Sequence, residues 1–258
     1  LYMIPKIIHY CWFGEKSIPE EQLKFINKWK EVCPDWEIIL WNENNFNIDS
    51  ILFTQKAYEL KKYAFVSDYV RVWALNKFGG VYLDTDVELK KNIDCFLKYD
   101  AFSCFETEGI PFTSAVWGSQ KNHSLLKKLL NYYQNKEFSL SESPNTVLIG
   151  NILEKKFNIN PLDNINQIGS DGVNSIHIFS SNYFCLDLPE NYASHHFFDS
   201  WASSKKKNSY KNVVHEKYHI NRLKLGSSYS KNTIKNISKN LSFRNVLWII
   251  KYYLKSKF

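Results

Sequence analysis

Two aspartates, Asp84 and Asp86, give the clearest chemical signal in this sequence. They follow a short apolar run that starts at the glycine pair Gly79 and Gly80, which predicts a strand after a helix. Side chains alternate between the faces of a strand, so such a strand places Tyr82 and both carboxylates on one face. Neighbouring carboxylates repel each other unless a proton or a cation lies between them. A divalent metal that accompanies a phosphate is a common reason to keep such a pair, so the segment predicts a metal site.

The preceding segment, 58–78, is apolar in nearly every turn, which predicts a helix buried on more than one face. Within it Asp68 and Arg71 are three residues apart and are therefore neighbours on one stripe of the helix. Burying a charge pair costs desolvation, so the two residues either form a structural pair or face a polar cavity. Beside a strand that carries two carboxylates, we favour the cavity.

Strands and helices alternate along the chain, which indicates an α/β sheet with mostly parallel strands. In such sheets, ligands bind at the carboxyl ends of the strands, where Trp12, Asn42 and the two aspartates are expected. The strands are predicted at 4–13, 36–41, 81–88, 101–105, 114–118 and 176–188, and the helices at 17–33, 58–78, 122–133 and 145–157.

Composition indicates a folded protein: 44% of the 258 residues are hydrophobic and 16% are aromatic, which is ample for a core and excludes wholesale disorder. The five cysteines are scattered and odd in number, which argues against a zinc knuckle and favours a reducing compartment. The sequence starts without the pattern of a secretion signal, and no apolar run approaches the ~20 residues that span a bilayer. We therefore expect a cytoplasmic protein, either soluble or peripheral to a membrane.

The net charge of +7 favours an anionic partner, and much of the excess lies late, in 205–207 and the lysines that follow. This distribution favours a basic tail over a nucleic-acid groove, and we expect no nucleic-acid partner. We place a catalytic domain at 1–204 and a basic, partly helical segment at 205–258. Within that segment Phe243, Leu247 and Ile250 fit one face of a helix, which would lie either in the interface of a membrane or against the core.

Two further pairs of residues follow the last predicted strand: His195 with His196, and Ser200 with Trp201. Histidine can complete the coordination shell of a metal, and hydroxyl and indole groups can donate hydrogen bonds to phosphate oxygens. The alternative is that the histidines are surface residues and that Trp201 belongs to the core. The sequence has no Walker-type phosphate loop and no Gly-x-Ser-x-Gly elbow, so a phosphate would be held by a metal and by side chains.

Five motifs follow one another along the chain: Ile4-Pro5-Lys6-Ile7-Ile8-His9-Tyr10-Cys11-Trp12-Phe13-Gly14, Ser67-Asp68-Tyr69-Val70-Arg71, Gly79-Gly80-Val81-Tyr82-Leu83-Asp84-Thr85-Asp86, His195-His196 and Ser200-Trp201. This ordered set resembles the family-32 glycosyltransferases, which carry a DxD motif and are related to yeast outer-chain mannosyltransferases and to the catalytic domains of clostridial glucosylating toxins. The resemblance covers roughly the first four fifths of the chain and implies a GT-A fold.

The resemblance also implies roles for the nucleotide-binding residues. Trp12 matches the residue that stacks on the base, and Asn42 lies where the loop after the second strand approaches the nucleoside. Ser200 and Trp201 are expected to donate hydrogen bonds to the diphosphate, and Tyr82 is expected among the donor-binding residues.

The catalytic and metal-binding roles follow in the same way. Asp68 and Arg71 match the pair that holds the sugar hydroxyls and the phosphate side of the leaving group. Asp84 is expected to face the ribose and the metal, and Asp86 to ligate Mn²⁺ or Mg²⁺ directly. His195 is the expected further metal ligand, with His196 as the alternative. Where the family has Gly-Pro, this chain has Ser143-Pro144.

The expected function is retaining transfer of a hexosyl group (galactose, glucose or an N-acetyl derivative) from a nucleotide sugar, with UDP as the nucleotide by family habit. Mannose with guanine is also compatible. The acceptor is expected to be a saccharide, lipid-linked by analogy, in the synthesis of a bacterial capsule or other surface polysaccharide. Two alternatives stay open: a metal-dependent phosphoesterase or nuclease, and a catalytically silent carbohydrate-binding assembly subunit at the cytoplasmic face of a membrane.

Overall fold

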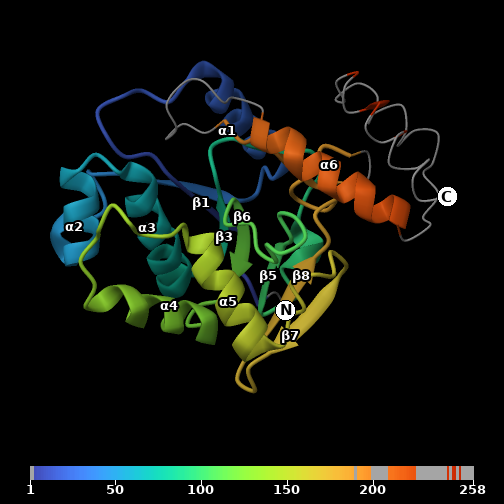
Figure 1. The fold of residues 1–258 in the computed structure, drawn as a ribbon. Coiled ribbons are helices and arrows are strands. Elements are labelled where there is room, and N and C mark those ends of the chain that lie inside the picture. Colours follow the sequence, from blue (N-terminus) through green and yellow to red (C-terminus); the bar gives the residue numbers. More distant parts are fainter. Residues whose placement is uncertain are drawn as a thin grey trace.

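The centre of the computed structural model is a seven-stranded sheet in the order β2-β1-β3-β6-β5-β8-β7 (Figure 1). The model describes residues 3–188, 191–198 and 209–224, together with positions 243, 246, 247 and 250. Strands β2, β3, β5 and β8 run in the same direction as β1, whereas β6 and β7 run in the opposite one. The predicted α/β sheet with mostly parallel strands is therefore confirmed. The strands are β1 (Ile7–Cys11), β2 (Glu37–Trp41), β3 (Gly80–Leu83), β5 (Ala101–Cys104), β6 (Val116–Ser119), β7 (Gln167–Ser170) and β8 (Ser175–Phe179).

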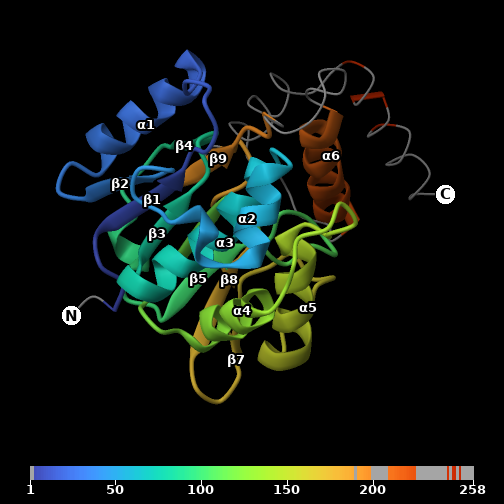
Figure 2. The same cartoon turned by 90° about the vertical axis from the view of Figure 1, so that its left-hand side faces the viewer.

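Helices cover both faces of the sheet, and two hydrophobic clusters fill the space between the layers. One cluster joins the sheet to α2 (Leu52–Glu59), α3 (Tyr63–Phe78), α4 (Ser124–Gln134) and α5 (Asn145–Phe157). The other joins it to α1 (Glu20–Val32) and α6 (Ser209–Lys224). A separate two-stranded sheet of β4 (Val87–Leu89) and β9 (Ala193–His195) appears between α1 and α6 in Figure 2.

Strand β3 contributes side chains to both hydrophobic clusters and ends at Leu83, immediately before Asp84. Tyr82 packs in the first cluster, and Val81 and Leu83 pack in the second, as the alternation of a strand requires. The turn from α3 into β3 needs glycine, because Gly79 and Gly80 have φ angles of +67° and +112°. A Cβ on Gly80 would also lie 2.6 Å from the carbonyl oxygen of Ile7. This turn fixes α3 relative to the end of β3.

Three predicted elements differ from the structure. The helix expected over 58–78 is two helices, α2 and α3, separated at Lys61, whose φ angle is +55°. The strand expected over 81–88 ends at Leu83, and β4 begins at Val87 in the other sheet. The strand expected over 176–188 ends at Phe179, because the chain then turns at Ser181, whose carbonyl accepts two backbone N–H groups.

Helix α6 lies within the predicted basic segment and packs against the core through Val214 and Tyr218, which are 1% and 5% exposed. The boundary at 204/205 lies outside the described residues and stays a prediction. Of the amphipathic helix expected near the C-terminus, the described positions 243, 246, 247 and 250 are helical. Among the described residues, no helix is both long enough and apolar enough to cross a bilayer.

Candidate active site

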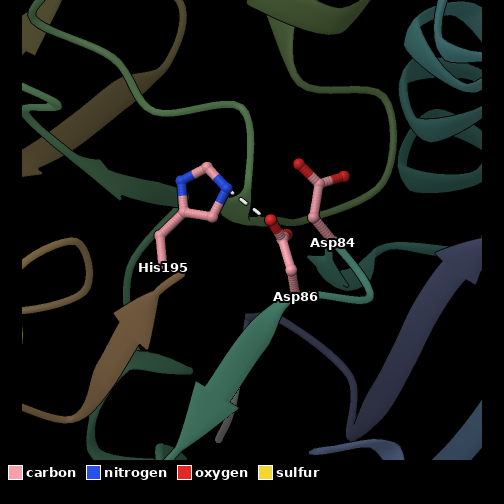
Figure 3. Close-up of side chains that lie close together, drawn as sticks. All are labelled: Asp84, Asp86 and His195. Atoms are coloured by element: carbon pink, nitrogen blue, oxygen red, sulfur yellow. Dashed lines mark ion pairs between the residues drawn. The ribbon is translucent and has the colours of Figure 1, made fainter. Parts of the chain in front are cut away.

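The two aspartates lie in the short turn that joins β3 to β4, at the carboxyl end of β3 (Figure 3). The turn is held by backbone hydrogen bonds: Asp84 donates to the carbonyl of Ala115 over 2.9 Å, and Val87 donates to the carbonyl of Asp84 over 3.0 Å. Potential ligand atoms of Asp84, Asp86 and His195 all lie within 4.8 Å of one another. The turn therefore brings the carboxylates together, although the predicted continuous strand was wrong.

Residues 195–198 surround Asp86. The Nε2 atom of His195 lies 3.3 Å from one carboxylate oxygen of Asp86, and the backbone N–H of Phe198 donates to the other over 2.9 Å. The backbone N–H of His196 donates to the Asp86 carbonyl over 3.0 Å. A loop that is far away in the sequence thus fixes both the backbone and the side chain of Asp86.

The electrostatics of this pair keep Asp86 ionised. Burial alone would raise the pKa of Asp86, but the charge and hydrogen bond of His195 and the N–H of Phe198 lower it below its ordinary value. Burial also disfavours a charged imidazole, yet Asp86 raises the pKa of His195. Asp86 is therefore held as an anion, which is the form that binds a cation.

The donor set fits a divalent metal. Two carboxylates and one imidazole suit Mn²⁺, and the two carboxylates also suit Mg²⁺. The Nε2 atom of His195 faces Asp86, while its buried Nδ1 has no hydrogen-bond partner within the described part of the chain.

Arg71 joins this cluster to Asp68. Its Nη2 atom lies 3.2 Å from Asp68 and 3.3 Å from Asp84, and its Nη1 donates to the carbonyl of Ser114 over 2.7 Å. The guanidinium carbon lies 4.4 Å from the centre of the Tyr82 ring, and the Tyr82 hydroxyl donates to Asp84 over 2.9 Å. The predicted pair Asp68 and Arg71 therefore does exist, and it faces the carboxylate turn.

Burial disfavours the charged form of both residues and therefore shifts their pKa values in opposite directions. Burial raises the pKa of Asp68 to about 7, although Arg71 opposes the shift. Burial would lower the pKa of Arg71, but Asp84, Tyr82 and Asp68 together keep it above its ordinary value. Arg71 is therefore a permanent cation between two carboxyl groups, and its side chain is only 6% exposed.

Trp12 and Asn42 follow the adjacent parallel strands β1 and β2, as predicted, and the Trp12 N–H donates to the Trp41 carbonyl over 3.0 Å. Both side chains are partly exposed. The indole of Trp12 donates to the carbonyl of Lys16 over 2.6 Å, and the Asn42 side chain accepts the N–H of Asn44. Their roles toward a nucleoside stay predictions.

The other residues predicted to bind the metal or the diphosphate either lie apart from Asp84, Asp86 and His195 or fall outside the described residues. His196 is 3.0 Å from Glu88 and stacks on Phe25 with ring centres 4.7 Å apart. The imidazole of His195, and not that of His196, therefore lies beside the Asp86 carboxylate. Ser200 and Trp201 lie outside the described residues.

The sequence interpretation missed Asn145, the first residue of α5. Its backbone hydrogen-bonds the Asp68 carboxylate, and its side chain is 4% exposed, with an amide nitrogen that has no partner among the described residues. Pro144 immediately before it is a helix-start signal that places this N–H in the first turn of α5. The N-terminal end of α5, which follows Ser143-Pro144 in the chain, therefore lies beside Asp68.

The α/β fold and the DxD turn beside an Asp–Arg pair are the arrangement that the sequence motifs predict for a glycosyltransferase. Residues 19–103 match the family model described as a glycosyltransferase sugar-binding region containing a DXD motif. Over this third of the chain, the protein is therefore similar to DXD-containing glycosyltransferases.

Its relatives include proteins from a virus and from yeast. The chain is 27% identical over 218 residues to uncharacterized glycosyltransferase L373 of Acanthamoeba polyphaga mimivirus, covering 78% of this chain and 84% of that protein. It is 30% identical to inositol phosphoceramide mannosyltransferase 3 of Schizosaccharomyces pombe, covering 49% of this chain but only 36% of that one. Among solved structures, PaToxG glycosyltransferase is 18% identical, with a TM-score of 0.47 over 59% of this chain and 69% of that chain.

Proposed function

We propose that the protein transfers a hexosyl group, with retention, from a nucleoside-diphosphate sugar to a saccharide acceptor, and that Asp84, Asp86 and His195 hold Mn²⁺ or Mg²⁺. The observation that carries the proposal is the continuous series of contacts from Asp68 through Arg71 to Asp84, and on to the group of potential metal ligands. In this proposal Asp68 contacts the sugar hydroxyls, and the metal ligands at the other end of the series hold the diphosphate.

In the proposed reaction, the bond between the anomeric carbon and the phosphate oxygen breaks, and its electron pair leaves with the nucleoside diphosphate. The acceptor hydroxyl bonds to the anomeric carbon on the same face, and its proton passes to the leaving phosphate. Asp84, Asp86 and His195 would hold a divalent metal, which would supply positive charge next to the diphosphate. Arg71 adds a preorganised cation to the same region, and Asp68 orients the sugar. Trapping of a covalent glycosyl-enzyme would contradict this same-face mechanism.

For the donor we propose a UDP-hexose, with GDP-mannose as the competing choice. The similarity to inositol phosphoceramide mannosyltransferases supports hexosyl transfer and an acceptor that carries a lipid. For this chain we propose a lipid-linked saccharide used in a capsule or other surface polysaccharide.

The donor is tested by incubating the purified protein with Mn²⁺ and a panel of UDP-glucose, UDP-galactose, their N-acetyl forms and GDP-mannose. We expect slow hydrolysis of one nucleotide sugar, measured by release of the nucleoside diphosphate and lost on addition of EDTA. Cleavage of polynucleotides without any sugar-nucleotide hydrolysis would instead favour a phosphoesterase. Saccharide binding without turnover of any donor would favour a silent assembly subunit.

We further propose that the basic segment contacts the cytoplasmic face of a membrane. Residues 205–258 contain fourteen lysines and arginines and a single acidic residue, Glu216. Phe243, Leu247 and Ile250 follow helical spacing and are 78%, 51% and 49% exposed. A basic segment with an exposed apolar face fits an anionic lipid surface.

This contact predicts sedimentation of the protein with vesicles that contain phosphatidylglycerol, and not with vesicles of phosphatidylcholine alone. Binding should weaken at high salt and in a variant with Phe243→Asp and Leu247→Asp, because both charge attraction and apolar burial contribute. Val173→Asp, at an apolar residue that is 77% exposed elsewhere, is the matched control. Equal sedimentation of all three proteins would refute the contact.

A further inference from the structure

Helix α6 packs directly against the loop that supplies His195. Val214 and Tyr218 anchor the helix in the same hydrophobic cluster that contains Ala193 and Phe197. At the N-terminal end of the helix, Tyr210 contacts Phe197, with ring centres 5.4 Å apart and planes at 76°. The next residue, Lys211, reaches His196, with 3.4 Å between its Nζ and the imidazole Nδ1. Two consecutive residues of α6 therefore contact this loop.

The loop needs such support because Phe197 has a φ angle of +52°, which is unfavourable for a bulky side chain. The ring of Phe197 lies between those of His195, 3.9 Å away, and Tyr210. The residues on both sides of Phe197 donate hydrogen bonds to Asp86. The strained conformation is thus what directs the backbone on both sides toward Asp86, and a strained residue persists only where its surroundings hold it.

The hydroxyl of Tyr210 makes a second contact with the site. It donates a hydrogen bond to the carboxylate of Glu106, which lies just beyond the carboxyl end of β5 and is 8% exposed. The carbonyl of Glu106 lies 3.8 Å from the Cys185 thiol, and the carbonyl of Cys185 accepts the backbone N–H of His195 over 3.0 Å, so Glu106 is connected to His195 through Cys185. Tyr210 therefore contacts Glu106 with its hydroxyl and Phe197 with its ring.

We propose that Tyr210 is a positioning residue of the metal site: through Phe197 and Glu106 it holds the loop 195–198 so that His195 and Asp86 keep their mutual geometry. The inference rests on the proposed metal-dependent function. Residues behind metal ligands commonly change metal affinity about 10–100-fold when they are replaced. Tyr210 thereby connects α6, which is part of the basic segment, to the turn between β3 and β4 that carries Asp84 and Asp86.

The test is the affinity of the full chain for Mn²⁺ alone, measured by titration calorimetry and by the Mn²⁺ electron paramagnetic resonance signal. Tyr210→Phe keeps the ring against Phe197 and removes only the hydrogen bond to Glu106, so we expect a rise in Kd of about 3–10-fold. Tyr210→Ala removes both contacts, and we expect a rise of about 10–100-fold. At saturating Mn²⁺, turnover should return close to that of the unmodified protein.

Two control variants separate positioning from general stability. Val213→Ala changes a residue on α6 that is 39% exposed, and should leave both Kd and Tm unchanged. Val214→Ala removes core packing from the same helix, and should lower Tm with little effect on Kd. Unchanged Mn²⁺ affinity in both Tyr210 variants would overturn the inference alone. Absence of Mn²⁺ binding by the unmodified protein would overturn the proposed metal site and the inference together.

Discussion

Asp86→Asn is expected to lower metal-dependent sugar transfer by about 10³-fold while the protein stays folded. Asparagine has nearly the same shape, and its amide oxygen can still accept the N–H of Phe198. The substitution removes the charge, however, and it is the charge that holds His195 and would bind the cation. Transfer at varied Mn²⁺ concentration measures the loss, and far-ultraviolet circular dichroism checks the fold.

Glu88→Gln is the matched control for this experiment. Glu88 lies two residues further on, in β4, and its carboxylate pairs with His196 at 3.0 Å instead of joining the metal cluster. Glutamine keeps an acceptor for that imidazole, so we expect less than about a twofold change in activity. Full Mn²⁺-stimulated activity in Asp86→Asn, or an equal loss in both variants, would contradict the metal assignment.

The sequence was sufficient to predict that Asp84 and Asp86 lie close together, because they are two residues apart in the chain. The predicted reason was nevertheless wrong: the aspartates share a turn between two sheets, not one face of a strand. Alternation of apolar residues continues through Val87, so the pattern cannot show that β4 leaves the main sheet to pair with β9. Pairing between distant strands depends on partners that local patterns do not reveal.

Contacts within one helix or between adjacent strands were predictable for the same reason. Asp68 and Arg71 are neighbours by helical spacing, and Trp12 and Asn42 share an edge because β1 and β2 are parallel. By contrast, Tyr210 and Glu106 are 104 residues apart, and no periodicity connects them. The supporting residues of the site therefore emerge only from the folded chain, whereas its charged residues were recognisable beforehand.

One cation, Arg71, pairs with two carboxyl groups to which the proposed reaction assigns different roles. Arg71 lies about equally far from Asp68 and Asp84, and the hydroxyl of Tyr82 shares Asp84 with it. A substitution of Arg71 is therefore expected to disturb both Asp68, proposed to orient the sugar, and Asp84, proposed to bind the metal. Because all of these groups are buried or partly buried, water can replace the lost cation only in part.

Arg71→Ala is expected to lower kcat by about 10²–10³-fold, with a smaller effect on KM, because the charge that Arg71 stabilises develops mainly in the transition state. Removing the cation also leaves Asp68 and Asp84 without their partner, so we expect a loss of about 3–5 kcal/mol in the free energy of unfolding. Steady-state kinetics with varied donor and urea denaturation measure the two effects separately.

Arg71→Lys separates these two effects, because lysine restores the charge but cannot reach Asp68, Asp84 and the Ser114 carbonyl with one planar group. We expect it to recover part of the stability while kcat stays low. Lys77→Ala, at an exposed position near the end of the same helix, should change neither kcat nor KM. If Arg71→Ala raised only KM, Arg71 would contribute uniform donor binding and not stabilisation of the leaving diphosphate.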